Sequence, residues 1–224
     1  MKKFPILILM VMITALNFGQ VNSNYDGPKP EIKKGSKSFV FRYTPFQSNL
    51  EPAYVSTVSD FDEENLDLFG IGFRYFFTDE IGVTGGLNFG TSSSSEEFTN
   101  GDKLDISSTS FGISADANYH FHALYSVSPY VGVNINFGSL SSTTEETEDG
   151  TTTKTEYYGN GFGVGVNFGF DWYFTAGLSL GGKYTLGLRR LGKPEVKTGN
   201  TTIEGQSSSF FGIGYASIIL NVHI

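Results

Sequence analysis

Six charged side chains interrupt stretches that otherwise carry glycine, serine and asparagine. They are Arg42, Arg74, Asp116, Asp171, Lys183 and Arg189. Each stands in a segment where apolar residues alternate with small or polar ones, and each lies on the polar side of that alternation. Charges that face protein rather than water are stable only when they are paired and hydrogen-bonded. The pattern therefore predicts a network of ion pairs inside a folded sheet.

Metal and acid–base chemistry would fall to the histidines. His120 and His122 are two residues apart, so on a strand they would share the inward face, and such a pair can hold a metal when a third ligand is close. No third ligand is evident, and the serines gather in polar stretches such as TSSSSEE at residues 91–97, away from the histidines. We therefore expect polar filling of an interior, with no metal, no cofactor and no catalytic site.

The elements that position these side chains are strands. Eight segments show period-two alternation, at residues 38–46, 67–77, 81–91, 110–122, 129–138, 159–174, 176–190 and 209–224. In the segment 159–174, phenylalanine, valine and tryptophan alternate with glycine, asparagine and aspartate. The parity changes within the last segment, which predicts a bulge near Ser217. The connections after the even segments are short, whereas those after the odd segments are long and polar, so all tight turns are expected at one end.

The glycine-rich face of the strands indicates whether the barrel is surrounded by water or by lipid. A soluble barrel would need charged residues on the face that meets water, but here that face carries glycine, serine, asparagine and threonine. Eight strands enclose an interior just wide enough for side chains, which could not hold all the large apolar groups. If the apolar residues instead face acyl chains, the small and polar ones fill the lumen, and the sheet must close because lipid satisfies no open edge. On this view Val166→Arg is unfavourable, while lumen-facing Asn167 should accept serine.

The N-terminus predicts export. Residues 1–23 contain two lysines, an apolar run and then small polar residues, which is typical of a signal peptide cleaved after Gly19 or Ser23. We expect a periplasmic linker at 24–35 and a barrel at 36–224. The chain has no cysteine and a net charge of −8, so it lacks disulfides and does not suit nucleic acid, which requires a basic surface.

In these features the chain resembles the small eight-stranded outer-membrane barrels, which are OmpA/OmpX-like and form the outer membrane protein β-barrel domain family. The resemblance covers residues 36–224 and rests on the signal peptide, the strand count and the unequal connections. It implies an all-β, antiparallel, up-and-down transmembrane barrel in a Gram-negative outer membrane, inserted by the barrel-assembly machinery. Members usually end in an aromatic residue; here Ile224 takes that place.

The expected function is structural, with a plugged polar lumen and four long acidic extracellular loops that contact lipopolysaccharide or an extracellular ligand. The protein is expected to be a monomer. In the lumen, Asp116 should be bridged by Lys183 or Arg42, and Asp171 by Arg74, nearer the short turns. Two alternatives remain open at this point. One is a narrow porin for small solutes, and the other is a soluble secreted barrel that binds an apolar ligand.

Overall fold

The computed structural model describes residues 27, 30, 32–47, 68–98 and 101–224. The predicted signal peptide and the first long connection therefore lie outside the described residues. Within the described part of the chain, no helix is long and apolar enough to cross a membrane. The strands are β1 (Lys37–Gln47), β2 (Leu68–Phe76), β3 (Ile81–Glu97), β4 (Lys103–His120), β5 (Val127–Glu148), β6 (Thr151–Thr175), β7 (Leu178–Leu191), β8 (Glu195–Thr198), β9 (Thr201–Glu204) and β10 (Ser208–His223).

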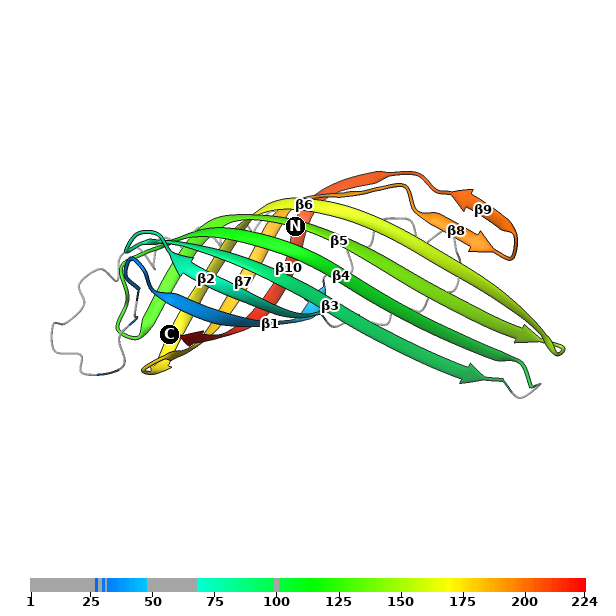
Figure 1. The fold of residues 1–224 in the computed structure, drawn as a ribbon, viewed down its shortest axis with the longest axis horizontal. Coiled ribbons are helices and arrows are strands. Elements are labelled where there is room, and N and C mark those ends of the chain that lie inside the picture. Colours follow the sequence, from blue (N-terminus) through cyan, green and yellow to red (C-terminus); the bar gives the residue numbers. More distant parts are fainter. Residues whose placement is uncertain (1–26, 28–29, 31, 48–67, 99–100) are drawn as a thin grey trace, which may run out of the picture.

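Eight of these strands form a closed antiparallel ring. Each strand from β1 to β7 pairs with the next, β7 pairs with β10, and β10 returns to pair with β1. Every strand of the ring therefore has two neighbours, which satisfies backbone hydrogen bonding where lipid cannot. Figure 1 shows the strands strongly inclined around a common axis. The predicted eight-stranded antiparallel barrel is confirmed.

Side-chain exposure along β1 shows which face meets the lumen. Phe39 and Phe41 are 49% and 47% exposed, whereas Val40 and Arg42 between and beside them are 2% and 8% exposed. The same alternation holds on the other barrel strands, where the buried set consists mainly of serine, threonine, asparagine and charged residues. The interior is thus polar and the exterior apolar, which is the arrangement predicted for a barrel surrounded by lipid.

The apolar exterior has the height of a membrane. On β6 an unbroken series of outward apolar residues runs from Phe162 to Phe174, which is about 40 Å along a strand at about 3.3 Å per residue. For a strand tilt of about 40°, this corresponds to about 30 Å along the membrane normal, the thickness of a hydrocarbon core. Aromatic pairs mark the turn end of the band, with ring centroids 4.9–5.8 Å apart: Tyr75–Phe77, Tyr119–Phe121 and Trp172–Phe174.

The expectation of four long loops is wrong for the second and third connections. β3 and β4 stay paired as far as Glu97 and Lys103, and β5 and β6 as far as Glu148 and Thr151. Figure 1 shows these strands continuing well beyond β1 and β2. The error has a physical cause: outside lipid both faces of a strand meet water, so hydroxyl residues continue the ladder without any apolar alternation.

The fourth connection also contains strands. β8 and β9 form a hairpin, and β8 pairs with the outer part of β6 between Thr155 and Tyr158. The described residues therefore contain ten strands rather than eight, and eight of these form the ring. Together the outer parts of β3 to β6 and the β8–β9 hairpin form one sheet, which we call the extracellular extension.

The bulge in the last strand lies slightly earlier than predicted. The pairing of β10 with β7 shifts between Ile213 and Tyr215 rather than near Ser217. Downstream, Ser217 and Ile219 are buried while Ile218 and Leu220 are exposed. The even positions of the C-terminal segment therefore face lipid, as the alternation of the sequence indicates.

Candidate functional site

The first polar cluster of the lumen centres on Asp116 of β4. Arg42 of β1 donates from Nη2 to Asp116 Oδ2 at 2.9 Å, and Lys183 Nζ of β7 lies 3.1 Å from both carboxylate oxygens. All three side chains are less than 10% exposed. One buried carboxylate thus binds two cations, one from a strand that precedes β4 in the sequence and one from a strand that follows it. We call Asp116, Arg42 and Lys183, together with the amides that bind Asp116, the Asp116 cluster.

Two asparagines complete the coordination of this carboxylate. Asn134 and Asn167 donate from Nδ2 to Asp116 Oδ1 at 2.7 and 2.9 Å. Thr185 in turn donates to Asn167 Oδ1 at 2.9 Å. Counting these bonds with those from Arg42 and Lys183, Asp116 accepts five hydrogen bonds. Such saturation offsets the cost of removing the carboxylate from water.

A second cluster lies nearer the short turns. Arg74 of β2 donates from Nη1 to Asp171 Oδ2 of β6 at 2.5 Å and from Nε to Thr84 Oγ1 at 3.2 Å. Asn221 donates to the other oxygen of Asp171 at 3.0 Å. Arg74 and Asp171 are 2% and 0% exposed. This pair, which we call the Asp171 cluster, is balanced in charge.

Aromatic rings fill the lumen beside the Asp171 cluster. Phe76, Tyr130 and Tyr173 are at most 3% exposed. The ring of His120 lies with its centroid 5.0 Å from both Phe76 and Tyr130, and its Nδ1 is 3.0 Å from Ser128 Oγ. The Arg74 guanidinium lies 5.9 Å from the centroid of Tyr130, a cation–π distance. The turn end of the barrel is thus packed with rings as well as ion pairs.

Two residues singled out in the sequence lie elsewhere. Arg189 is half-buried farther along β7, toward β8, and belongs to neither cluster. His122 lies beyond the end of β4 and is exposed, so it does not share the inward face with His120. The strand ends two residues earlier than the alternation suggested, because the chain leaves the ladder after His120 to reach β5. In the described residues, no group of three His, Cys, Asp or Glu side chains is placed to hold a metal.

Inward amides and rings contribute as much to the lumen as the charges, and charge alone does not reveal them. The alternation does place Asn134, Asn167 and Asn221 on the lumen face, and that parity was the available signal. Phe76 gave a misleading one, because it looks like one more apolar residue in the run Tyr75–Phe77. Its parity, shared with Gly70, Gly72 and Arg74, nevertheless places it inward, and in the structure its ring lies over Gly82 of β3.

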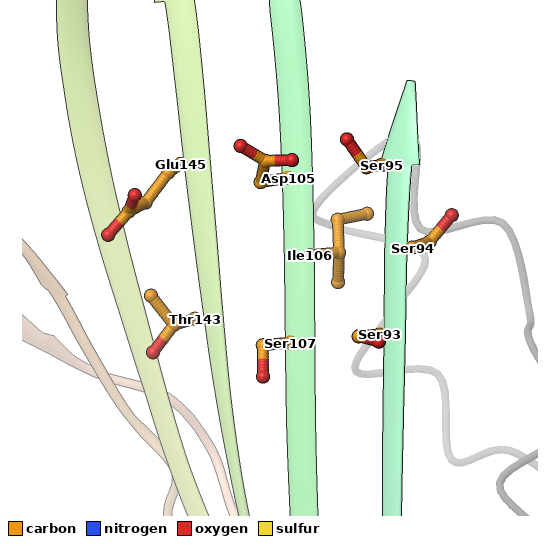
Figure 2. A pocket seen from close by; sticks show the side chains of 8 residues that line it. All are labelled: Ser93, Ser94, Ser95, Asp105, Ile106, Ser107, Thr143 and Glu145. Carbon is orange, nitrogen blue, oxygen red and sulfur yellow. The ribbon is translucent and has the colours of Figure 1, made fainter.

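The extracellular extension carries a different surface, rich in hydroxyls and carboxylates. Figure 2 shows a hollow across β3, β4 and β5 on this sheet. It is lined by Ser93, Ser94, Ser95, Asp105, Ile106, Ser107, Thr143 and Glu145. Asp105 and Glu145 are direct partners in the β4–β5 register. A hydrogen bond from Lys103 Nζ, 2.7 Å from Asp105 Oδ2, lowers the pKa of Asp105 and raises the pKa of Lys103.

The chemistry of the two lumen clusters suits them to obstruct the lumen and to stabilise the barrel. Their carboxylates are committed to ion pairs and amides. The extension offers exposed hydroxyl and carboxylate oxygens, which suit contacts with polar or cationic groups.

Comparisons with known proteins are consistent with this geometry. Residues 15–216 match the family described as outer membrane protein beta-barrel domain. A comparison with curated protein sequences gives no match. Among solved structures, the attachment invasion locus protein Ail of Yersinia pestis is 13% identical with a TM-score of 0.44, covering 85% of this chain and 99% of that one. OprG from Pseudomonas aeruginosa is 11% identical with a TM-score of 0.47, covering 86% and 97%.

The family match spans most of the chain, and it agrees with the closed ring, the polar lumen and the apolar exterior. The protein is therefore located in the outer membrane of a Gram-negative bacterium. The chain belongs to the outer membrane protein β-barrel domain family.

Proposed function

We propose that this protein is a non-enzymatic, non-conducting scaffold of the outer membrane that presents the extracellular extension as its contact surface. The observation that carries the proposal is the filling of the lumen by the Asp116 and Asp171 clusters. Both carboxylates bind cations from other strands at 2.5–3.1 Å. In a barrel whose interior is only wide enough for side chains, such crossing pairs leave little room for a hydrated ion.

The aromatic layer supports the same proposal. Phe76, Tyr130 and Tyr173 occupy the turn end of the lumen and are almost completely buried. A solute that passed the Asp116 cluster would next meet these rings and the pair between Arg74 and Asp171. Obstruction at two levels favours a closed barrel over a narrow porin.

The contact surface would lie above the membrane. The extension carries Glu96 and Glu97 on β3 and Glu145, Glu146 and Glu148 on β5. These carboxylates, with the neighbouring hydroxyls, would meet the divalent cations and phosphates of lipopolysaccharide, or a polar extracellular ligand. The barrel-assembly machinery would insert the protein into the membrane and would recognise the lipid-facing alternation of the C-terminal segment that ends at Ile224. The mature protein would be a monomer.

Planar-bilayer recording tests the closed lumen. The wild-type barrel should give no steady openings, because each carboxylate is held by buried cations. Asp116→Ala removes the common partner of Arg42 and Lys183 and should produce openings. Ser107→Ala, on the extension, is the matched control and should remain silent. Large, steady channels in the wild type that do not change in Asp116→Ala would overturn the proposal and favour the porin.

The contact surface has its own test. Removing residues 142–157, whose ends are partners in the β5–β6 register, and joining the strands by a short turn shortens the extension without altering the ring. The shortened barrel should still fold in vesicles, but its cells should lose binding to lipopolysaccharide-coated or host-matrix surfaces. Unchanged binding to every surface that the wild type binds would remove the extension from the proposal.

A further inference from the structure

The Asp116 cluster contains more positive than negative charge. Arg42 and Lys183 share a single carboxylate, whereas Arg74 and Asp171 form a balanced pair. The two clusters together therefore hold three cations and two carboxylates, and all five side chains are less than 10% exposed. An unbalanced charge in such a place is costly, so the Asp116 cluster calls for a further anion.

The hydrogen bonds of the cluster show the same imbalance. Asp116 already accepts five bonds, about as many as a carboxylate has lone pairs to offer. Arg42 donates from Nη2 to Asp116 and from Nη1 to Ser114, the latter at 3.3 Å. Its Nε is buried, and no acceptor for it is found in the described part of the chain. Lys183 uses its ammonium on the two oxygens of Asp116. Donors thus exceed acceptors at this point.

The wall next to Arg42 is built from glycines. Its register partner on β2 is Gly70, and the next inward position on that strand is Gly72. Gly72 in turn lies opposite Gly86 of β3. These three positions place no side chain of their own beside the guanidinium, and the side-chain oxygens of Asn88 and Ser114 lie over Gly70 and Gly86.

We propose that the lumen binds a small monovalent anion, of the size of chloride, at the Nε of Arg42 beside Lys183. The anion would supply the missing acceptor and balance the excess cation. The narrow interior selects for a small ion, because an eight-stranded barrel has little space beyond its own side chains. The anion site is independent of the proposed obstruction of the lumen, because the ion would be bound whether or not the barrel conducts.

Unfolding in urea tests the site, with the barrel folded in lipid vesicles. Sodium and ionic strength are held constant while gluconate, which is too large for the lumen, is replaced by chloride. Wild-type stability should rise with chloride, in proportion to the logarithm of its concentration above the dissociation constant; at ten times that constant, chloride raises the folded-to-unfolded ratio about eleven-fold. Arg42→Met leaves the balanced pair of Lys183 with Asp116, so its stability should not respond to chloride. Lys103→Met removes an exposed cation of the extension and should respond as the wild type does.

A wild type that does not respond to chloride would overturn the proposal, and so would an equal response in Arg42→Met. If Arg42→Met does not fold, crystals of the wild-type barrel grown in bromide decide the question. An anomalous peak at hydrogen-bonding distance from Arg42 Nε supports the site, and its absence contradicts it. Bilayer recordings are not involved, so the anion site and the closed lumen can fail independently.

Discussion

Arg74 and Asp171 are 97 residues apart in the sequence, yet Arg74 Nη1 lies 2.5 Å from Asp171 Oδ2 in the interior of the barrel. The pair joins β2 to β6 across the lumen, and both side chains are at most 2% exposed. Neither residue could be stable in this position without the other. The fold and the ion pair therefore depend on each other.

Removing one partner of this pair should be strongly destabilising. Arg74→Met leaves Asp171 buried without its cation, which should cost about 3–5 kcal/mol in the free energy of unfolding. Urea unfolding in lipid vesicles, followed by tryptophan fluorescence, measures the change. The control is Lys103→Met, which breaks an exposed ion pair of the extension and should lower the urea midpoint far less, because exposed pairs contribute little. Similar midpoints for the two variants would mean that the lumen pair is not a structural element.

A charge on the lipid-facing surface should be tolerated far less than one on the extension. Val133 of β5 and Ile203 of β9 are 57% and 63% exposed, but only Val133 lies at the height of the acyl chains. Val133→Arg should cost about 2–4 kcal/mol, whereas Ile203→Arg should be close to neutral. Folding yields in vesicles compare the two. Equal losses would show that the band around Val133 does not face lipid.

Asn167 should matter more than its place on a polar strand face suggests. From the sequence we expected serine to replace it with little loss, but Asn167 donates to Asp116 and accepts from Thr185, both at 2.9 Å. A serine is too short to make both bonds, so Asn167→Ser should cost about 1–3 kcal/mol. Asn160→Ser, at an exposed position of the same strand, is the control. If both variants unfold at the wild-type midpoint, the amide is not needed.

Protease added to intact cells should cut at the tips of the extension and not within it. The β5–β6 connection is a tight turn at Asp149 and Gly150, and the β8–β9 turn contains Gly199. The paired strands between these turns and the membrane should resist cleavage, because a protease requires an unpaired extended segment. Mass spectrometry of the fragments locates the cuts. Cleavage confined to the opposite turn at residues 78–80 would invert the topology.

The ion pair on the extension should titrate in the acid range. The hydrogen bond from Lys103 lowers the pKa of Asp105 below its ordinary value of 3.8. A carboxyl with a lowered pKa in the folded state adds stability above the pKa of the unfolded state and loses it as pH falls through the folded pKa. The contribution should therefore disappear only below about pH 4. Carbon NMR titration of the barrel in micelles should show the pKa of Asp105 rising in Lys103→Met; an unchanged pKa would contradict the assignment.

The sequence alone determined the class of fold and the direction of the barrel side chains. Alternation with period two survives wherever one face meets lipid and the other meets protein, so the strands around Phe41, Val133 and Phe162 could be located from their residues. It also placed Arg42, Arg74, Asp116, Asp171 and Lys183 on one face, because charges that must avoid lipid have only the lumen available. Above the membrane this signal disappears, since both strand faces meet water.

Only the tertiary structure decided what lies beyond that limit. The long partnership of β5 with β6, and of β3 with β4, depends on backbone ladders that hydroxyl residues form without any apolar pattern. The two amides that donate to Asp116 come from two other strands, β5 and β6, and their contact depends on the register between these strands and β4. The contact of the Phe76 ring with Gly82 likewise depends on how β2 is aligned with β3. Register is a property of the closed ring as a whole, because moving one strand by one residue would reverse every side chain on it.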